Sequence, residues 1–220
     1  MSSEGLTYAL ECEMTDNGYE LVCGVDEAGR GPLCGPVVAA AVILPVGLVI
    51  DGLNDSKKLT EKKREALYDV ICKEALAYSI AYGSVEEINE YNILEATLLA
   101  MRRAIDGLPV KPSFALIDGN INRGFQIPSR AVIHGDAISP SIAAASILAK
   151  VTRDRLCIEL DREYPQYGIA KHKGYGTKAH CDALFEHGAS PIHRTQFVRF
   201  LNDPEGKKRS SGGRKKKDAE

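Results

Sequence analysis

The sequence lacks the features of a membrane or secreted protein. Its longest apolar run, residues 36–50, is broken by Pro45 and Gly47 and is shorter than the roughly 18 residues that suggest a membrane span. The N-terminus is acidic, with Glu11 and Glu13, and has no basic residues followed by an apolar stretch, so it does not resemble a secretory signal. We therefore expect a cytoplasmic protein with no membrane contacts.

Metal-binding and disulfide-forming cysteine patterns are also missing. No C-x-x-C pair occurs among the cysteines, which are Cys12, Cys23, Cys34, Cys72, Cys157 and Cys181. This spacing argues against a zinc site and against a disulfide framework, so most of the cysteines are expected to be small apolar core residues. Nor does the spacing of His172, His180, His187 and His193 predict a zinc site, and packing or hydrogen-bonding roles are expected for most of them.

Positive charge is not in excess. The chain has 28 Lys and Arg against 30 Asp and Glu, a formal net charge of −2. A uniformly basic surface is thereby excluded, and any contact with nucleic acid must come from local clusters. Two basic runs, 207–209 and 214–217, lie in residues 203–220, which contain no large apolar residue and are expected to form a disordered tail. The tail either attracts phosphates nonspecifically or is simply solvated.

The pattern of apolar residues that remains predicts an α/β protein. Strands are expected over residues 19–25, 37–44, 114–117 and 131–133. Helices are expected over 61–78 after Thr60, after the caps Ser84 and Asn92, over 141–164 after Ser139-Pro140, and over 177–186 before Gly188. Strands early in the chain and helices interleaved later favour a sheet packed by helices, with a strand order that the pattern does not determine.

Acidic residues follow several of the predicted strands. Asp26, Glu27, Asp118 and Asp136 each come shortly after an apolar segment and have a glycine within two residues. If the strands are neighbours, their carboxyl ends would bring these acids together. Oxygen ligands alone favour Mg²⁺ or Mn²⁺, and two such ions roughly 3.5–4 Å apart can activate water for phosphodiester hydrolysis. Alternatively, each acid is a turn former or a helix cap.

The adjacent acids Asp26 and Glu27 raise a geometric difficulty. Neighbouring side chains in a regular strand point to opposite faces, so both cannot reach one ion unless the strand deforms. Gly29 and Gly31 make a deformation plausible. Alternatively, Glu27 offers its backbone carbonyl to the metal.

The sequence around this pair reads VDEAGRGP at residues 25–32. This stretch resembles the opening motif of type 2 ribonucleases H, specifically bacterial ribonuclease HII. Further stretches resemble that family in the same order: NDSKKL at 54–59, IDGN at 117–120, GDA at 135–137, IAAASILAKVTRD at 142–154, HKGYGT at 172–177 and HR at 193–194. The likeness covers about residues 21–201. Two departures are His134, where many members have lysine, and Gln196, where serine is more common.

The resemblance implies an endonuclease that cuts the RNA strand of RNA–DNA hybrids. It also implies cleavage 5′ to single ribonucleotides embedded in duplex DNA, leaving 5′-phosphate and 3′-hydroxyl ends. The implied fold is a ribonuclease H-like mixed sheet flanked by helices, over residues 19–167. A partly ordered segment, 1–18, precedes it, and a small helical extension, 168–202, follows it. The protein is expected to be a monomer, and the alternative is a noncatalytic hybrid-binding protein.

The resemblance also implies roles for individual residues. Asp26, Glu27, Asp118 and Asp136 would hold catalytic Mn²⁺ or Mg²⁺. Gly29, Arg30 and Gly31 would recognise the ribose 2′-hydroxyl, which distinguishes RNA from DNA. Tyr175 would pack on the sugar at the RNA–DNA junction. Arg30 could also bind a phosphate or pair with a nearby acid, and the lysines are candidate clamps on the substrate backbone or solvated surface groups: Lys57, Lys58, Lys171 and Lys173.

Overall fold

The computed structural model describes residues 5–202, so the expected basic tail lies outside the described residues. The chain forms two compact units. The first contains the residues up to Arg30 together with Pro36–Arg155, and the second contains Gly31–Gly35 and the residues from Leu156 onward. The chain therefore contributes one short segment to the second unit, returns to the first unit, and joins the second unit again after Arg155.

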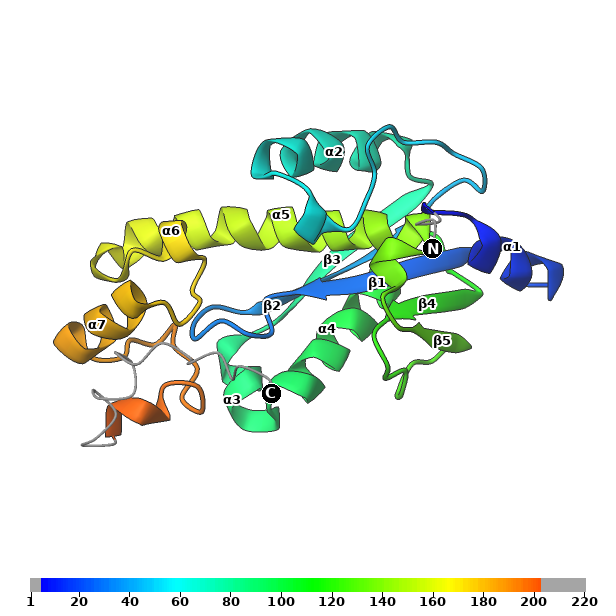
Figure 1. Cartoon of the computed structure of the whole chain (residues 1–220). Helices are drawn as coiled ribbons and strands as arrows, with labels where there is room; N and C mark the ends of the chain where they lie inside the picture. The colour runs from blue at the N-terminus through cyan, green and yellow to red at the C-terminus, as the bar shows by residue number, and fades with distance from the viewer. Residues whose placement is uncertain (1–4, 203–220) are drawn as a thin grey trace, which may run out of the picture. The chain divides into compact units, whose positions relative to one another are not determined.

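The first unit is built on a five-stranded sheet with the order β3-β2-β1-β4-β5 (Figure 1). Its strands are β1 (Val22–Ala28), β2 (Val37–Ile43), β3 (Ala77–Gly83), β4 (Phe114–Asp118) and β5 (Ser129–Val132). β2 pairs antiparallel with β1 and β3, whereas β4 pairs parallel with β1 and β5. The mixed α/β sheet predicted from the sequence is confirmed, and β1, β4 and β5 end at the same edge.

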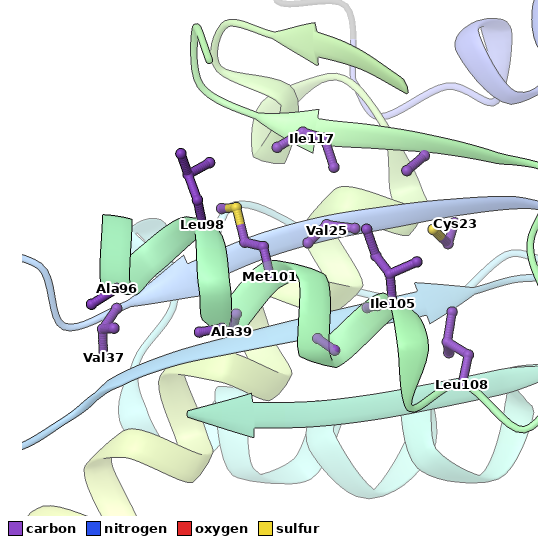
Figure 2. Packing of buried hydrophobic residues seen from close by; sticks show 14 of the residues in the cluster. Cys23, Val25, Val37, Ala39, Ala96, Leu98, Met101, Ile105, Leu108 and Ile117 are labelled. Atoms are coloured by element: carbon purple, nitrogen blue, oxygen red, sulfur yellow. The ribbon is translucent and has the colours of Figure 1, made fainter. Parts of the chain in front are cut away.

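Helices cover both faces of this sheet. They are α1 (Ala9–Asp16), α2 (Glu61–Glu74), α3 (Val85–Tyr91), α4 (Ile93–Asp106) and α5 (Pro140–Glu163), with the 3-10 turns η1 (Ser56–Lys58) and η2 (Gly135–Ala137). Helix α4 packs on one face, where Leu98, Met101 and Ile105 form a core with Val25 and Ile117 (Figure 2). Successive side chains along each strand thus point alternately into this core and to the opposite face.

Helices α2 and α5 cover the opposite face of the sheet (Figure 1). Ala144 and Ala149 of α5 pack in one core with Val42 of β2. The spacing between β1 and α5 is especially small at Gly24, where a Cβ would lie 2.2 Å from the backbone carbon of Ser141. The small residues of α5 therefore allow its backbone to lie directly on the sheet.

Most predicted helix starts are confirmed. The Thr60 side chain accepts a hydrogen bond from the first turn of α2. Ser84 and Glu87 form a reciprocal capping box at α3, and the Asn92 side chain caps α4. α5 begins at Pro140 as expected.

The predicted helix over residues 61–78 is wrong at its C-terminal end. Helix α2 ends at Glu74, and the chain continues into β3, which the sequence analysis did not predict. Leu76, which lies within the range of the predicted helix, is 56% exposed, and its N–H donates to the carbonyl of Ile43. Pairing with β2 along all of β3 satisfies the backbone groups on that side of the strand. A local apolar pattern gives no information about this distant partner.

Helix α1 was also not predicted. Its Glu11 is 1% exposed, and one carboxylate oxygen accepts hydrogen bonds from Ser139 Oγ at 2.6 Å and from the Ser141 N–H at 3.3 Å. Because Ser141 lies in the first turn of α5, the carboxylate is placed at the positive end of the helix dipole. Glu11 therefore ties α1 to the start of α5.

The second unit is assembled around Gly31–Gly35. Its short helical elements are η3 (Pro165–Tyr167), α6 (Ile169–His172), α7 (Lys178–His187) and η4 (Arg199–Asn202). The Leu33 N–H donates to the Gly174 carbonyl, and the fully buried Arg194 side chain donates to the carbonyls of Pro32 and Gly35. Among residues 5–202, no helix is both long and apolar enough to span a bilayer.

Candidate active site

Three carboxylates meet where the parallel strands end. Asp26 lies in β1, Asp118 is the last residue of β4, and Asp136 lies in η2, just after β5. One oxygen of each carboxylate lies within 4.8 Å of the oxygens of the other two. Asp26 and Asp136 are buried, and Asp118 is half-buried. Three of the four predicted acids are thus brought together.

Strand register places Asp26 beside Asp118. Val25 pairs with Ile117 in the parallel β1–β4 ladder, and both side chains point into the α4 core. The following residues, Asp26 and Asp118, therefore point to the opposite face together.

The turn after β5 completes the carboxylate cluster. The Asp136 N–H donates to Asp118 Oδ1 at 3.4 Å, which links the turn to the end of β4. The preceding residue has to be small, because a Cβ at Gly135 would lie 2.5 Å from Ile142 Cδ1 and 3.3 Å from the same Asp118 oxygen. Glycine thus allows the turn to approach β4 closely.

Burial and mutual repulsion oppose ionisation of these acids. Burial raises the pKa of the Asp26 carboxyl well above its ordinary value, and the charges of Glu27 and Asp118 raise it further. Burial also raises the pKa of Asp118, and the Asp136 carboxylate adds to this effect. A cation bound among the three would offset the cost. A donor set made only of carboxylate oxygens fits a hard divalent ion, so the residues present fit a Mg²⁺ or Mn²⁺ site.

Glu27 is not a member of the group of three aspartates, although its charge acts on Asp26. In the β1–β2 ladder, Asp26 pairs with Ala40 and Glu27 pairs with Ala39, so the strand keeps a regular register. The deformation considered in the sequence analysis is therefore not present within β1. The Glu27 side chain instead lines a pocket of about 30 Å³ together with Asp118 and Arg30. Burial raises the pKa of Glu27, although the nearby Arg30 charge counteracts it.

Lys57 contributes a positive charge to the cluster. Its Nζ lies 2.7 Å from Asp136 Oδ2 and 3.9 Å from Asp55 Oδ1, while its side chain is 75% exposed. Burial lowers the pKa of Lys57, but the hydrogen bond and charge of Asp136 outweigh this and raise it overall. The Asp55 side chain also accepts from the Lys57 N–H, which fixes the η1 turn. An exposed ammonium group is thus held beside a buried carboxylate.

The turn after β1 depends on glycine and on a buried arginine. Gly29 has φ +99°, and a Cβ there would lie 2.0 Å from Nε of Arg153, which is 2% exposed. The Arg30 side chain is 52% exposed and pairs with Glu27 at 3.3 Å, which is the acid pairing that the sequence analysis left open. The sequence analysis gave Arg153 no role. The one local signal was an arginine within a helix of small residues.

The second unit contains the predicted residues Gly31, Lys171, Lys173 and Tyr175, whereas Lys58 lies in η1 of the first unit. The Tyr175 ring is 48% exposed, and its Cε1 would lie 3.4 Å from a Cβ at Gly31. Hydrogen bonds hold its backbone: the N–H donates to the His172 carbonyl, and the carbonyl accepts from His180 Nδ1. Lys173 ends α6 in a left-handed conformation with φ 53°. Tyr175 is therefore an exposed ring on a fixed backbone.

Comparison with known proteins gives one consistent family. A family model described as Ribonuclease HII matches residues 23–200. The Ribonuclease HII of Burkholderia pseudomallei (strain 668) is 60% identical over 179 residues, which cover 81% of this chain and 84% of the relative. The Ribonuclease HII of Desulfitobacterium hafniense is 58% identical over 182 residues, covering 83% and 70%.

The chain belongs to the ribonuclease HII family. Its fold is similar to the crystal structure of ribonuclease H2 from Pyrococcus horikoshii OT3, with a TM-score of 0.68, 28% identity, and coverage of 82% of this chain and 96% of that one. As a ribonuclease HII, the chain is an endoribonuclease that acts on RNA–DNA hybrids. Divalent metal ions are the cofactors of this class of enzyme.

This ribonuclease HII has two further features outside the carboxylate cluster. A larger hollow of about 280 Å³ contains none of the predicted site residues and is lined by Asp51, Gly52, Lys63, Ala66, Leu67 and Val70. In the second unit, Cys34 lies beside His180 and His193. Residue spacing gave no signal for this group, because its members come from separate segments of the chain.

Proposed function

We propose that this ribonuclease HII hydrolyses the phosphodiester bond 5′ to a ribonucleotide, including a single ribonucleotide embedded in duplex DNA. The observation that supports this proposal most directly is the convergence of Asp26, Asp118 and Asp136 within 4.8 Å. These carboxylates would hold Mg²⁺ or Mn²⁺. A bound divalent ion supplies water activation and stabilises negative charge at the phosphorus centre. Breaking the bond between phosphorus and the 3′-oxygen leaves 5′-phosphate and 3′-hydroxyl ends.

The protein's own groups position the substrate around these carboxylates. Glu27 and Arg30 line the same small pocket as Asp118, and their ion pair keeps the guanidinium beside the acids. In our proposal, Arg30 exchanges part of this pairing for a substrate phosphate, because a guanidinium binds phosphate through paired hydrogen bonds. Lys57, held next to Asp136, is placed to attract the phosphate backbone.

Recognition of the ribose is assigned to Gly29, Arg30, Gly31 and Tyr175. Glycine at 29 and 31 places no side chain in the way of a 2′-hydroxyl, which is the group that distinguishes RNA from DNA. Tyr175 supports this assignment because its ring is half exposed while its backbone is held by hydrogen bonds. Lys173, next to this loop, is a further candidate for contact with the substrate backbone. We also propose that the enzyme works in the cytoplasm as a monomer and takes part in removing ribonucleotides from DNA.

The proposal is tested on a DNA duplex that contains one ribonucleotide in one strand. With Mg²⁺ or Mn²⁺, the labelled strand should be cut once, at the bond 5′ to the ribonucleotide, and the all-DNA duplex should stay intact. Asp118→Asn should abolish the cut, and Asp51→Asn should leave it unchanged because Asp51 is an exposed turn residue outside the carboxylate cluster. Equal cutting of the all-DNA duplex would refute ribonucleotide recognition.

A noncatalytic hybrid-binding protein is not favoured. Such a protein would have no need for three carboxylates that oppose one another's ionisation. All four acids of the motif are present, and the family is one of nucleases. Binding of a hybrid with no metal-stimulated cleavage would support that alternative.

A further inference from the structure

The second unit contains a buried group of potential soft-metal ligands. Cys34 comes from the Gly31–Gly35 segment, His180 from α7, and His193 from the residues after α7. One donor atom of each lies within 4.8 Å of the donor atoms of the other two. Their exposures are only 1%, 0% and 3%, and Cys34 and His193 also pair through a β-bridge. The group is therefore part of a fixed backbone framework.

Hydrogen bonds determine the tautomer of each imidazole. The Ser190 N–H donates to His193 Nδ1 at 3.1 Å, so this nitrogen carries no proton. His193 Nε2–H then donates to His180 Nε2 at 3.2 Å, and His180 Nδ1–H donates to the Tyr175 carbonyl at 3.0 Å. Burial lowers the pKa of both rings, to about 4 for His193, so both are neutral at pH 7. Neutral imidazole is the form that binds metal ions.

We propose that Cys34, His180 and His193 form a zinc site that is separate from the carboxylate cluster. One thiolate sulfur and two imidazole nitrogens make a donor set that zinc prefers, and a fourth position remains for water or another ligand. Two nitrogens bound at about 2.0–2.1 Å to a tetrahedral ion lie about 3.3 Å apart. The observed separation of 3.2 Å between the two Nε2 atoms already matches this spacing.

Zinc binding requires two proton shifts and the exchange of one hydrogen bond. The Cys34 thiol releases its proton to solvent as the thiolate binds. The Nε2 proton of His193 is replaced by the ion, and His193 Nδ1 takes up a proton. Nδ1 then no longer accepts the Ser190 N–H, and it donates instead to Ser190 Oγ, which lies 3.0 Å away. His180 needs no change, because its Nδ1–H is already held by the Tyr175 carbonyl, the usual outer partner of a zinc-bound histidine. One proton is released for each zinc ion.

Ring stacking restrains the His180 ligand further. The rings of His172 and His180 are stacked, with centroids 4.4 Å apart and an angle of 19° between their planes. His172 is itself fixed by a hydrogen bond between its Nε2 and the Tyr167 carbonyl. His180 is thus held in its orientation before any ion binds, which lowers the cost of forming the site.

Cobalt(II) can serve as the probe for this site. Cobalt(II) binds the same kinds of ligand as zinc. A near-ultraviolet sulfur-to-cobalt charge-transfer band arises only when a thiolate coordinates the ion, so Co²⁺ bound at the carboxylate cluster does not produce it. The full-length protein, stripped with chelator, should develop the band with one equivalent of Co²⁺, and Zn²⁺ should remove it. Cys34→Ala should lose the band, whereas the matched control Cys181→Ala, one residue after His180, should keep it.

Folding and function are checked on the same samples. Cys34→Ala should keep the wild-type circular dichroism spectrum and its Mg²⁺-dependent cleavage, because Cys34 lies outside the residues assigned to substrate. His193→Gln, a second variant, should also lose the band. A band that persists in Cys34→Ala, or its absence from folded wild-type protein saturated with Co²⁺, would overturn the zinc site. Neither outcome depends on whether cleavage occurs at single ribonucleotides.

Discussion

At the residue scale, two adjacent acids have different surroundings because side chains alternate along β1. Asp26 points into the aspartate cluster, whereas Glu27 points to the other face and pairs with Arg30. We expect Asp26→Asn to remove most of the rise in melting temperature that Mg²⁺ produces, and Glu27→Gln to remove less of it. Differential scanning fluorimetry with and without Mg²⁺ measures this difference. Equal losses in the two variants would show that Glu27 is as much a ligand as Asp26.

Asp118→Asn should stabilise the metal-free protein while it abolishes cleavage. Because folding raises the pKa of Asp118, its ionised form costs stability once the pH exceeds the ordinary carboxyl value, and this cost is absent in acid. The asparagine oxygen can still accept the Asp136 N–H. In EDTA at pH 7, we expect a rise in melting temperature of about 2–4 °C, equivalent to roughly 1 kcal/mol for a chain of this size.

The stabilising effect of Asp118→Asn should have a specific pH dependence. The difference from wild type should shrink towards zero as the pH falls below about 4, the ordinary value for an aspartate. Asp51→Asn serves as the control, because Asp51 lies in an exposed turn. A melting temperature for Asp118→Asn that is lower than wild type in EDTA at pH 7 would contradict the proposed repulsion among the carboxylates.

Tyr175 is expected to matter for substrate and not for the fold. Its ring is 48% exposed, and the hydrogen bonds in which it takes part come from its backbone, which an alanine retains. Tyr175→Ala should therefore slow cleavage at a single ribonucleotide and leave the circular dichroism spectrum unchanged. Loss of the native spectrum would identify a structural tyrosine instead.

At the element scale, Gly24 sets the distance between β1 and α5. Its Cβ position is occupied by the backbone of Ser141 and Ile142, at 2.2–2.3 Å, and backbone cannot move aside as a side chain can. Gly24→Ala should cost about 1–3 kcal/mol in the free energy of unfolding, as overpacking does. Because Asp26 lies two residues further along β1, Mg²⁺ binding should weaken as well.

Chemical denaturation measures the cost of Gly24→Ala. Gly176→Ala is the matched control, since a Cβ at that glycine meets only the Leu33 side chain, at 3.4–3.6 Å. The control should unfold at the wild-type denaturant concentration. If Gly24→Ala unfolded there too, the close approach of α5 to β1 would not be a requirement of the fold.

Elements with a local chemical signal were predicted from the sequence. The capping box at Ser84 and the Pro140 start of α5 each depend on residues a few positions apart. β3 and α1 were missed because their stabilising partners are distant: β3 is defined by pairing with β2, and α1 is held by Glu11 at Ser139. A sequence pattern shows signals between residues a few positions apart, but it does not show which distant residues stabilise an element.

At the scale of the whole molecule, the second unit is made from two separate pieces of chain. Residues 156–220 alone lack the Gly31–Gly35 segment, so the buried Arg194 would lose the carbonyls of Pro32 and Gly35. A buried guanidinium that loses two of its hydrogen-bond acceptors is strongly unfavourable. We therefore expect the isolated 156–220 fragment to be unfolded by circular dichroism. A synthetic peptide of residues 30–36, added in excess, should increase its helical signal, and a scrambled peptide should not.

The candidate sites follow the same division between local and distant information. The four acids were predicted because each follows an apolar segment and because the motifs resemble ribonuclease HII. The regular path of β1, which turns the Glu27 side chain to the opposite face from Asp26, depends on pairing with β2. The Cys34, His180 and His193 group depends on a β-bridge between Cys34 and His193, which residue spacing does not show.

The parallel arrangement of β1, β4 and β5 also has a consequence for folding kinetics. The three aspartates come from segments that are distant in the chain and meet only when both parallel ladders have formed. Such long-range pairings form slowly, because the loops between them must close first. A refolding chain should therefore acquire its affinity for Mg²⁺ late, after helices such as α4 have formed. In a stopped-flow experiment, the time at which Mg²⁺ binding appears would then report when the pairing of the parallel strands is complete.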